Sequence, residues 1–101
     1  VIVLLNNGWL GMVKQWQKLF WDKRYSATDL RNGPDFIKIA EAYGAKGMTI
    51  TKPGDIADAL KEAVGSGETY LLNIHVDPEE DVLPMLPADP KQSMVKGRCP
   101  Y

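Results

Sequence analysis

The chain has 101 residues, of which 45% are hydrophobic and 25% charged, as is typical of one globular domain or part of one. Twelve basic and thirteen acidic side chains leave a formal net charge of −1, which favours neither nucleic acid nor an anionic membrane as a partner. The single cysteine, Cys99, excludes an internal disulfide and a cysteine metal cluster, and no apolar stretch is long enough to span a bilayer.

The first predicted element is the apolar run at residues 1–5, whose β-branched content is typical of a strand covered on both faces. The run stops at Asn6, Asn7 and Gly8. Since the chain begins within this strand and without a methionine, we expect it to be a piece of a longer protein. Residues 9–20 follow as a predicted helix, because apolar side chains recur there at helical spacing. These side chains share one face and are Trp9, Val13, Trp16 and Phe20.

The middle of the chain predicts a loop and then a second helix. Residues 21–32 are polar and aperiodic, which indicates the loop. Pro34 is expected in the first turn of the helix, since proline is favoured there, and Gly44 is a natural stop at the other end. The predicted core face of this helix consists of Phe36, Ile39, Ala40 and Tyr43.

Two strands and a third helix complete the predicted elements. We expect the strands at residues 47–50 and 69–76. The helix between them opens near Pro53 and ends near residues 65–67, where glycines flank a serine. Its predicted core residues are Ile56, Leu60 and Ala63.

The order of the elements, β-α-α-β-α-β with short connections, predicts an α/β fold. We expect a parallel sheet with flanking helices and right-handed crossovers. Residues 1–78 form a partial domain in this interpretation. Residues 79–101 are expected to form an irregular tail, because four prolines oppose regular structure there: Pro84, Pro87, Pro90 and Pro100.

The end of the first strand has the chemistry of a cofactor site. In parallel α/β sheets, ligands lie at the carboxyl ends of strands, which is where Asn6, Asn7 and Gly8 stand. An asparagine carbonyl is a hard oxygen ligand that suits Mg²⁺, and glycine permits close approach of a ligand. The following helix N-terminus offers free N–H groups to a diphosphate. The pattern indicates half of a Mg²⁺–diphosphate site, although the same tripeptide is also typical of a plain turn.

Several separated segments resemble one enzyme family in its order and spacing. Asn6 and Asn7 resemble the end of the thiamine-diphosphate motif that begins with Gly-Asp-Gly. Residues 11–17 (GMVKQWQ) and 34–44 (PDFIKIAEAYG) closely resemble the large, catalytic subunit of acetolactate synthase, and residues 82–86 (VLPML) match its C-terminal segment. The resemblance covers nearly the whole chain and implies the C-terminal part of a thiamine-diphosphate-binding domain.

The resemblance also implies a role for individual residues. Asn7 would give a side-chain oxygen to Mg²⁺, and Trp9 its backbone carbonyl. The positions that would line the cofactor are Asn7, Gly8, Leu10, Gly11 and Met12. Val13 and Trp16 would face the substrate channel, whereas the helical spacing alone favours core packing for both. No catalytic residue is expected within this chain.

The resembling enzymes are carboligases in branched-chain amino-acid biosynthesis. They condense pyruvate with a second 2-oxo acid to 2-acetolactate or 2-aceto-2-hydroxybutyrate, using thiamine diphosphate and Mg²⁺. FAD, where a member has it, would bind outside this chain. The resemblance implies a homodimer or tetramer, with or without a regulatory small subunit. We expect a cytoplasmic enzyme, or a plastid one if the source is a plant, and we expect this chain alone to be inactive.

Other polar residues are interpreted as structural or solvated. His75 is expected to be a structural or surface imidazole, the loop residues Lys23 and Arg24 a solvated basic turn, and residues 79–81 a solvated acidic run. Two alternatives to the carboligase remain. One is another thiamine-diphosphate enzyme, such as a pyruvate oxidase or glyoxylate carboligase. The other is a non-catalytic small α/β interaction domain.

Overall fold

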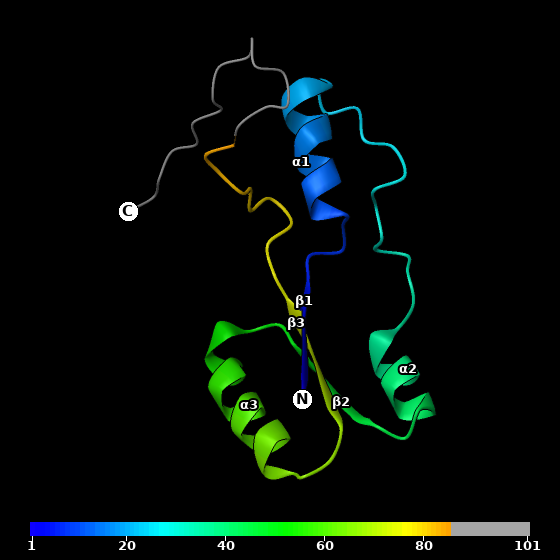
Figure 1. The fold of residues 1–101 in the computed structure, drawn as a ribbon, viewed down its shortest axis with the longest axis vertical. Coiled ribbons are helices and arrows are strands. Elements are labelled where there is room, and N and C mark those ends of the chain that lie inside the picture. Colours follow the sequence, from blue (N-terminus) through cyan, green and yellow to red (C-terminus); the bar gives the residue numbers. More distant parts are fainter. Residues whose placement is uncertain (86–101) are drawn as a thin grey trace.

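The computed structural model describes residues 1–85 and contains the predicted order of elements (Figure 1). Residues 86–101, which include Cys99 and most of the predicted tail, lie outside the described residues. The elements are β1 (Ile2–Asn6), α1 (Gly11–Phe20), α2 (Phe36–Ala42), β2 (Lys46–Ile50), the short 3₁₀ helix η1 (Pro53–Asp55), α3 (Ile56–Gly65) and β3 (Tyr70–His75).

The strands form a parallel three-stranded sheet in the order β1-β3-β2, which confirms the predicted α/β fold. The register pairs Asn6 with His75 and Ile50 with Ile74, so all three strands end at the same edge of the sheet. Figure 1 shows α2 and α3 on either side of the sheet, whereas α1 stands beyond the carboxyl end of β1. This arrangement leaves the carboxyl edge of β1 beside the first turn of α1.

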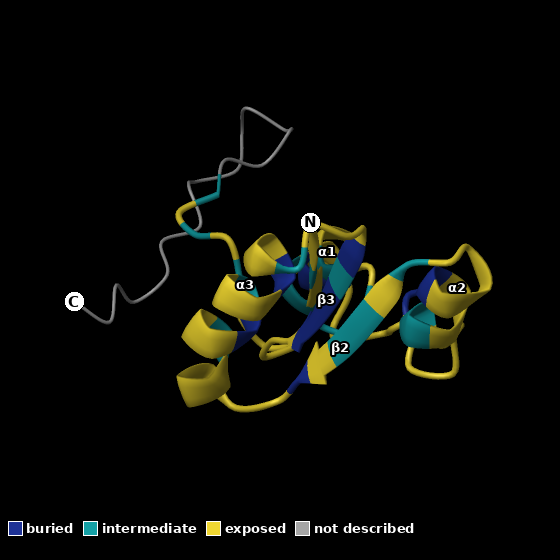
Figure 2. Cartoon of the chain, turned by 90° about the horizontal axis from the view of Figure 1, so that it is seen from below, coloured by how far each residue is buried: buried dark blue, intermediate teal, exposed yellow. Residues whose placement is uncertain are grey.

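The core lies between the sheet and α3. Buried positions gather on β3, as Figure 2 shows. Leu72 is fully buried and packs with Ile50 and Ala63 in one apolar cluster. The predicted inner face of the third helix is confirmed, since Ile56 and Leu60 pack against that cluster. The 3.6-residue repeat of α3 therefore positions its apolar side chains on β2 and β3.

The prediction that the first strand is covered on both faces is wrong for the described residues. Ile2, Val3 and Leu5 are 54%, 45% and 66% exposed. β1 lies at the edge of the sheet, and α1 leaves from its end instead of folding back over it (Figure 1). The apolar composition of the strand is correct, but nothing among residues 1–85 packs on it as a covering layer.

The second helix begins later than predicted because Asp35 caps it. The Asp35 carboxylate accepts hydrogen bonds from the backbone N–H groups of Ile37, at 3.0 Å, and Lys38, at 3.2 Å. Pro34 therefore precedes the cap and is not in the first turn. Ala40 is buried as predicted and Gly44 follows the helix at φ +74°, which confirms the stop.

Two residues of the predicted core face of α2 point elsewhere. Tyr43 is 89% exposed and Ile39 is 42% exposed. Ile37 packs on β2 instead, so closely that a Cβ on Gly47 would lie 3.0 Å from its Cδ1. The helix has only seven residues, and Ile37 is the side chain that contacts the sheet in place of Ile39. No helix within residues 1–85 combines the length and the apolar character of a membrane span.

Candidate functional site

The candidate site is built on the turn that joins β1 to α1. The Asn6 Oδ1 atom accepts a hydrogen bond from the Gly8 N–H at 2.9 Å, and the Asn7 Oδ1 atom accepts one from the Trp9 N–H at 3.0 Å. Gly8 adopts φ +68°, a conformation that side chains disfavour. The tripeptide is therefore a turn in which each asparagine side chain fixes the backbone two residues ahead.

The first residue of α1 lacks a side chain where Asn7 needs the space. A Cβ on Gly11 would lie 2.6 Å from the Asn7 Nδ2 atom, closer than real Cβ contacts allow. The Asn7 amide therefore rests directly against the start of α1. No acidic side chain occupies the first turn of this helix, so its free N–H groups face no competing carboxylate. Asn7, Gly8 and Gly11, three of the residues predicted to line the cofactor, thus lie close together in the fold.

Trp9 lies before the helix and not on its apolar face, which corrects the prediction of a helix over residues 9–20. It pairs with Asp29 in an isolated antiparallel bridge. On either side of it the Gly8 carbonyl accepts from the Leu30 N–H at 2.8 Å, and the Leu10 N–H donates to the Thr28 carbonyl at 2.9 Å. These bonds hold the chain extended, so α1 begins only at Gly11. Among residues 1–85 no hydrogen bond reaches the Trp9 carbonyl oxygen.

The Trp9 indole lies close to two cations. The Lys14 Nζ atom lies 4.7 Å from the indole centroid, and the Arg31 Cζ atom lies 5.2 Å from it. The Tyr25 ring meets the indole edge to face, with centroids 5.5 Å apart. Arg31 is also paired with Asp29, which lowers the pKa of that carboxyl to about 2. Three side chains thus pack around the Trp9 indole.

A pocket of about 410 Å³ opens at the carboxyl edge of the sheet. Asn6, Asn7 and Gly8 line it from one side, and Arg31 and His75 from others. Sequence reasoning missed the last two residues as members of the site. His75 could have been found, because a residue at the end of a parallel strand lies beside the ends of its neighbours. Arg31 could not, since only the folded loop brings it to Gly8.

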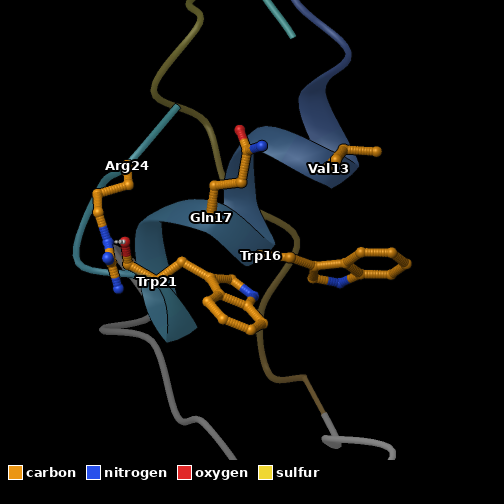
Figure 3. Close-up of a pocket in the computed structure, with 5 residues that line it drawn as sticks. All are labelled: Val13, Trp16, Gln17, Trp21 and Arg24. Atoms are coloured by element: carbon orange, nitrogen blue, oxygen red, sulfur yellow. Dashed lines mark hydrogen bonds between the residues drawn. The ribbon is translucent and has the colours of Figure 1, made fainter. Parts of the chain in front are cut away.

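A second pocket, of about 430 Å³, lies along α1 (Figure 3). Val13 and Trp16 line it, and Trp21 and Arg24 complete it from the residues after the helix. Val13 is 38% exposed and Trp16 is 47% exposed, so core packing is the wrong interpretation of this stripe among the described residues. The Arg24 Nε atom donates to the Trp21 carbonyl at 3.3 Å, which holds the Arg24 side chain beside the pocket.

The remaining predicted cofactor residues, Leu10 and Met12, lie at the start of α1 and are 46% and 41% exposed. Phe20, the last residue of the apolar stripe, is 40% exposed. The apolar face of α1 is therefore an open surface among residues 1–85. It runs from the turn after β1 to the pocket of Trp16.

The opposite face of α1 is polar and buried. Residues 78–85, here called the strap, run from the end of β3 along this face. Lys14 is 4% exposed, donates to the Pro78 carbonyl at 2.7 Å and forms an ion pair with Glu79. Gln15 is 2% exposed and bonds both backbone groups of Val82, donating at 2.9 Å and accepting at 2.8 Å. Two polar residues of α1 thus hold the strap.

Ion pairs extend this contact along the strap. Lys18 donates to Asp81 at 2.7 Å, which raises the pKa of the lysine. Hydrogen bonds from Lys14 and Lys18 lower the pKa of the Glu79 carboxyl. The expectation that residues 79–81 are solvated holds for Glu79, which is exposed although ion-paired, and is wrong for Asp81, whose side chain is 17% exposed. The lysines that pair with them lie more than sixty positions earlier in the sequence, beyond the reach of local patterns.

Comparison with known proteins agrees with this geometry. Residues 1–74 match the family model of the thiamine pyrophosphate enzyme, C-terminal TPP binding domain. The chain is 49% identical over 87 residues to a probable acetolactate synthase large subunit of Methanocaldococcus jannaschii, covering 86% of this chain and 15% of that protein. It is 45% identical over 86 residues to the acetolactate synthase isozyme 2 large subunit of Escherichia coli, covering 85% and 16%.

A eukaryotic relative extends the match. The mitochondrial acetolactate synthase catalytic subunit of Saccharomyces cerevisiae is 48% identical over 85 residues, covering 84% of this chain and 12% of that protein. The chain therefore spans between 12% and 16% of the length of these relatives. The predicted resemblance is confirmed: the chain belongs to the thiamine pyrophosphate enzymes, as their C-terminal TPP-binding domain, and is similar to the large subunits of acetolactate synthase.

Proposed function

We propose that the protein containing this chain is an acetolactate synthase that depends on thiamine diphosphate and Mg²⁺. It would condense pyruvate with a second 2-oxo acid, to 2-acetolactate or 2-aceto-2-hydroxybutyrate. The observation that supports the site is the packing of the Asn7 amide against Gly11, where a Cβ would come within 2.6 Å. That packing fixes the Asn7 amide, whose Oδ1 atom is the candidate ligand, at the start of a helix without a competing carboxylate.

The donor set suits Mg²⁺. The Asn7 Oδ1 atom accepts one hydrogen bond, from Trp9, and a carbonyl oxygen has a second lone pair for a metal ion. The Trp9 carbonyl has no hydrogen-bond donor among residues 1–85. Both are hard oxygens, which Mg²⁺ prefers together with phosphate oxygens and water. We assign Asn7 and Trp9 as the metal ligands that this chain contributes.

The start of α1 would hold the diphosphate. The N–H groups of the first turn have no intrahelical acceptor and the helix dipole favours an anion there. Gly11 makes room for the Asn7 amide, Gly8 allows the turn at φ +68°, and Leu10 and Met12 would contact the cofactor through their exposed side chains. When bound, thiamine diphosphate supplies the carbon nucleophile and the electron sink for decarboxylation.

The pocket along α1 would serve the substrate. Val13 and Trp16 offer apolar surface that excludes water from the reacting carbon, and Arg24 offers a cation for a carboxylate. This chain contributes binding and positioning groups, and no residue of it is assigned to proton transfer. We propose that the remaining catalytic residues lie outside residues 1–101, and that FAD, where it is retained, binds outside them as well. We also propose that this chain alone is inactive.

The names of the relatives favour this proposal over the alternatives. All three are acetolactate synthase large or catalytic subunits, and none is named a pyruvate oxidase or glyoxylate carboligase. The words large and catalytic subunit in their names support a further, regulatory subunit as a partner. We also propose that the intact protein is a homodimer or tetramer. We propose residues 1–78 as the share of the TPP-binding domain present here, with residues 79–101 as the tail that follows it.

The test is the Asn7→Ala variant of the intact protein. We expect the Mg²⁺ concentration for half-maximal thiamine diphosphate binding to rise at least ~10-fold, since a metal ligand is lost. Asn32→Ala, in the exposed loop before α2, is the matched control and should leave it unchanged. An unaltered Mg²⁺ dependence in Asn7→Ala would exclude this residue as a ligand. Formation of 2-acetolactate from pyruvate alone tests the assigned reaction.

A further inference from the structure

A chain of polar side chains crosses the sheet beneath the candidate site. Asn73 lies in β3, the central strand, and is 7% exposed within the otherwise apolar run YLLNIH. Tyr70, Leu72 and Ile74 of this strand join the apolar cluster with α3, so Asn73 faces the other side of the sheet. Burying an amide costs free energy unless its polar atoms are bonded, and this amide is bonded on both sides.

The bonds join all three strands. The Asn73 Nδ2 atom donates to the Thr49 hydroxyl of β2 at 3.4 Å, and the Asn73 Oδ1 atom accepts from the Asn6 Nδ2 atom of β1 at 3.1 Å. The register explains the reach: Asn73 lies opposite Leu4 and Thr49, and Asn6 is two residues beyond Leu4 on the same face. We call Thr49, Asn73 and Asn6 the amide relay.

The relay ends at the backbone of the candidate site. The Asn6 side chain has one carbonyl and one NH₂ group, so bonding one end fixes the direction of the other. With its NH₂ on Asn73, Asn6 presents its carbonyl oxygen to the Gly8 N–H at 2.9 Å. That bond supports Gly8 at φ +68°, and Gly8 follows directly after Asn7. The Asn73 amide in the sheet is thus linked through two hydrogen bonds to the turn that contains Asn7.

We propose that Asn73 is a positioning residue for the metal-binding turn, acting through Asn6 and the Gly8 N–H. The inference rests on the proposed function, because it concerns how Asn7 is presented to Mg²⁺. Asn73 does not touch the metal ion or the cofactor in this scheme. It selects the orientation of Asn6 and so restricts the turn to the conformation in which Asn7 packs against Gly11.

Two variants of similar size separate positioning from packing in the intact protein. Asn73→Leu removes the acceptor for Asn6, whereas Asn73→Asp keeps an acceptor oxygen at the same place. We expect Asn73→Leu to raise the Mg²⁺ concentration for half-maximal thiamine diphosphate binding by ~10-fold, the low end of the effect of losing a direct outer partner, because Asn73 acts through Asn6 and Gly8. Asn73→Asp should stay within about 3-fold of the parent, because the Asn6 bond survives.

The readouts are equilibrium binding of thiamine diphosphate during Mg²⁺ titration and the Tm of the cofactor-free protein. Thr49→Val, at the far end of the relay, is expected to stay within about 3-fold of the parent in Mg²⁺ dependence. A lower Tm in Asn73→Leu with an unchanged Mg²⁺ dependence would reduce Asn73 to a structural residue and overturn the proposal. Equal losses in the Leu and Asp variants would do the same.

Comparison with the Asn7→Ala variant distinguishes failure of the amide relay from failure of the proposed metal site. If Asn7→Ala weakens Mg²⁺-dependent binding and Asn73→Leu does not, the relay has no role in positioning and the proposed metal site stands. If neither variant changes the Mg²⁺-dependent binding of thiamine diphosphate, the assignment of the metal site itself is wrong. Should Asn73→Leu fail to fold, Asn73→Ala removes the same acceptor with a smaller side chain and is judged by the same two readouts.

Discussion

The two ends of this molecule are held together by different forces. At one end, β2, β3 and α3 enclose an apolar cluster around Leu72, which has no exposed surface. At the other end, the buried side chains of α1 are Lys14 and Gln15, and its apolar face is open. Burial of apolar surface is therefore the main stabilising force in the sheet layer, whereas hydrogen bonds and ion pairs orient the helix that follows the candidate site.

The position of α1 explains the difference. It stands beyond the end of β1 and packs on neither face of the sheet formed by the described strands (Figure 1). Its support comes from the strap and from the loop before α2, where Gln17 bonds Thr28 at 3.0 Å. Such contacts are directional, so they fix orientation more strongly than they add stability. The two ends should therefore respond differently to substitution.

The largest effect is expected in the apolar cluster. Leu72→Ala should lower the free energy of unfolding by about 2–5 kcal/mol, because it removes a fully buried side chain and leaves a cavity. Val64→Ala, on the outer face of α3 where the side chain is 70% exposed, is the control and should change it by less than about 0.5 kcal/mol. Urea unfolding of the intact protein measures both. A Leu72→Ala variant as stable as the control would show that this layer does not hold the fold.

A smaller effect is expected where α1 meets the strap. Gln15→Leu removes both bonds to the Val82 backbone and should lower the free energy of unfolding by about 1–3 kcal/mol. Gln15→Glu keeps the acceptor for the Val82 N–H but loses the donor to its carbonyl, so it should lie between the parent and the leucine variant. Urea unfolding ranks the three proteins. If Gln15→Leu is as stable as the parent, the strap does not fix α1.

Local patterns were sufficient for the sheet layer. The 3.6-residue repeat of α3 and the apolar runs of the strands are set by which side chains must leave water, so periodicity identified Ile56, Leu60 and Ala63 correctly. The strand-end rule also identified the Asn7 turn before any geometry was known. In both cases the sequence signal and the structural cause lie within a few residues of each other.

Local patterns failed where distant residues decide the outcome. Trp9 was assigned to the helix, but the Asp29 bridge keeps it extended. The helical spacing predicts Tyr43 in the core, but α2 ends at Ala42 and Tyr43 follows it as an exposed C-cap residue. Burial of Lys14 and Gln15 depends on the strap, which is more than sixty residues away. The metal and substrate assignments within the site stay predictions, because they concern groups that bind to the folded chain.

Two glycines at helix ends provide the next comparison. Gly11→Ala should push the Asn7 amide away, since the new Cβ would lie 2.6 Å from Nδ2, and should weaken Mg²⁺-dependent cofactor binding by roughly 10-fold or about 1.4 kcal/mol. Gly65→Ala, at the last residue of α3, meets no atom within 4 Å and should stabilise the fold by about 0.4–1 kcal/mol without changing binding. If Gly11→Ala and Gly65→Ala bind the cofactor with the same Mg²⁺ dependence, the position of Asn7 against Gly11 is not required for binding.

The smallest expected effect is a dependence on pH that belongs to the α1 end alone. Bonds from Lys14 and Lys18 lower the pKa of Glu79 in the folded state from its ordinary value of 4.5. A lowered folded-state pKa means that this stabilisation is complete above about pH 4.5 and is lost as the pH falls through the folded pKa. Glu79→Gln should therefore be less stable than the parent at pH 7, and the difference should shrink below pH 4.5.

Urea midpoints measured from pH 7 to pH 3 test this, with Glu41→Gln on the exposed side of α2 as the matched control. Glu41 forms no ion pair within residues 1–85, so its substitution removes no ion pair of the described fold. If the urea midpoints of Glu79→Gln and the parent differ by the same amount at every pH, the charge of the Glu79 carboxylate does not hold the strap. Leu72→Ala sharpens the contrast: its cost comes from a cavity, and a cavity does not titrate, so its gap should stay constant over the same range.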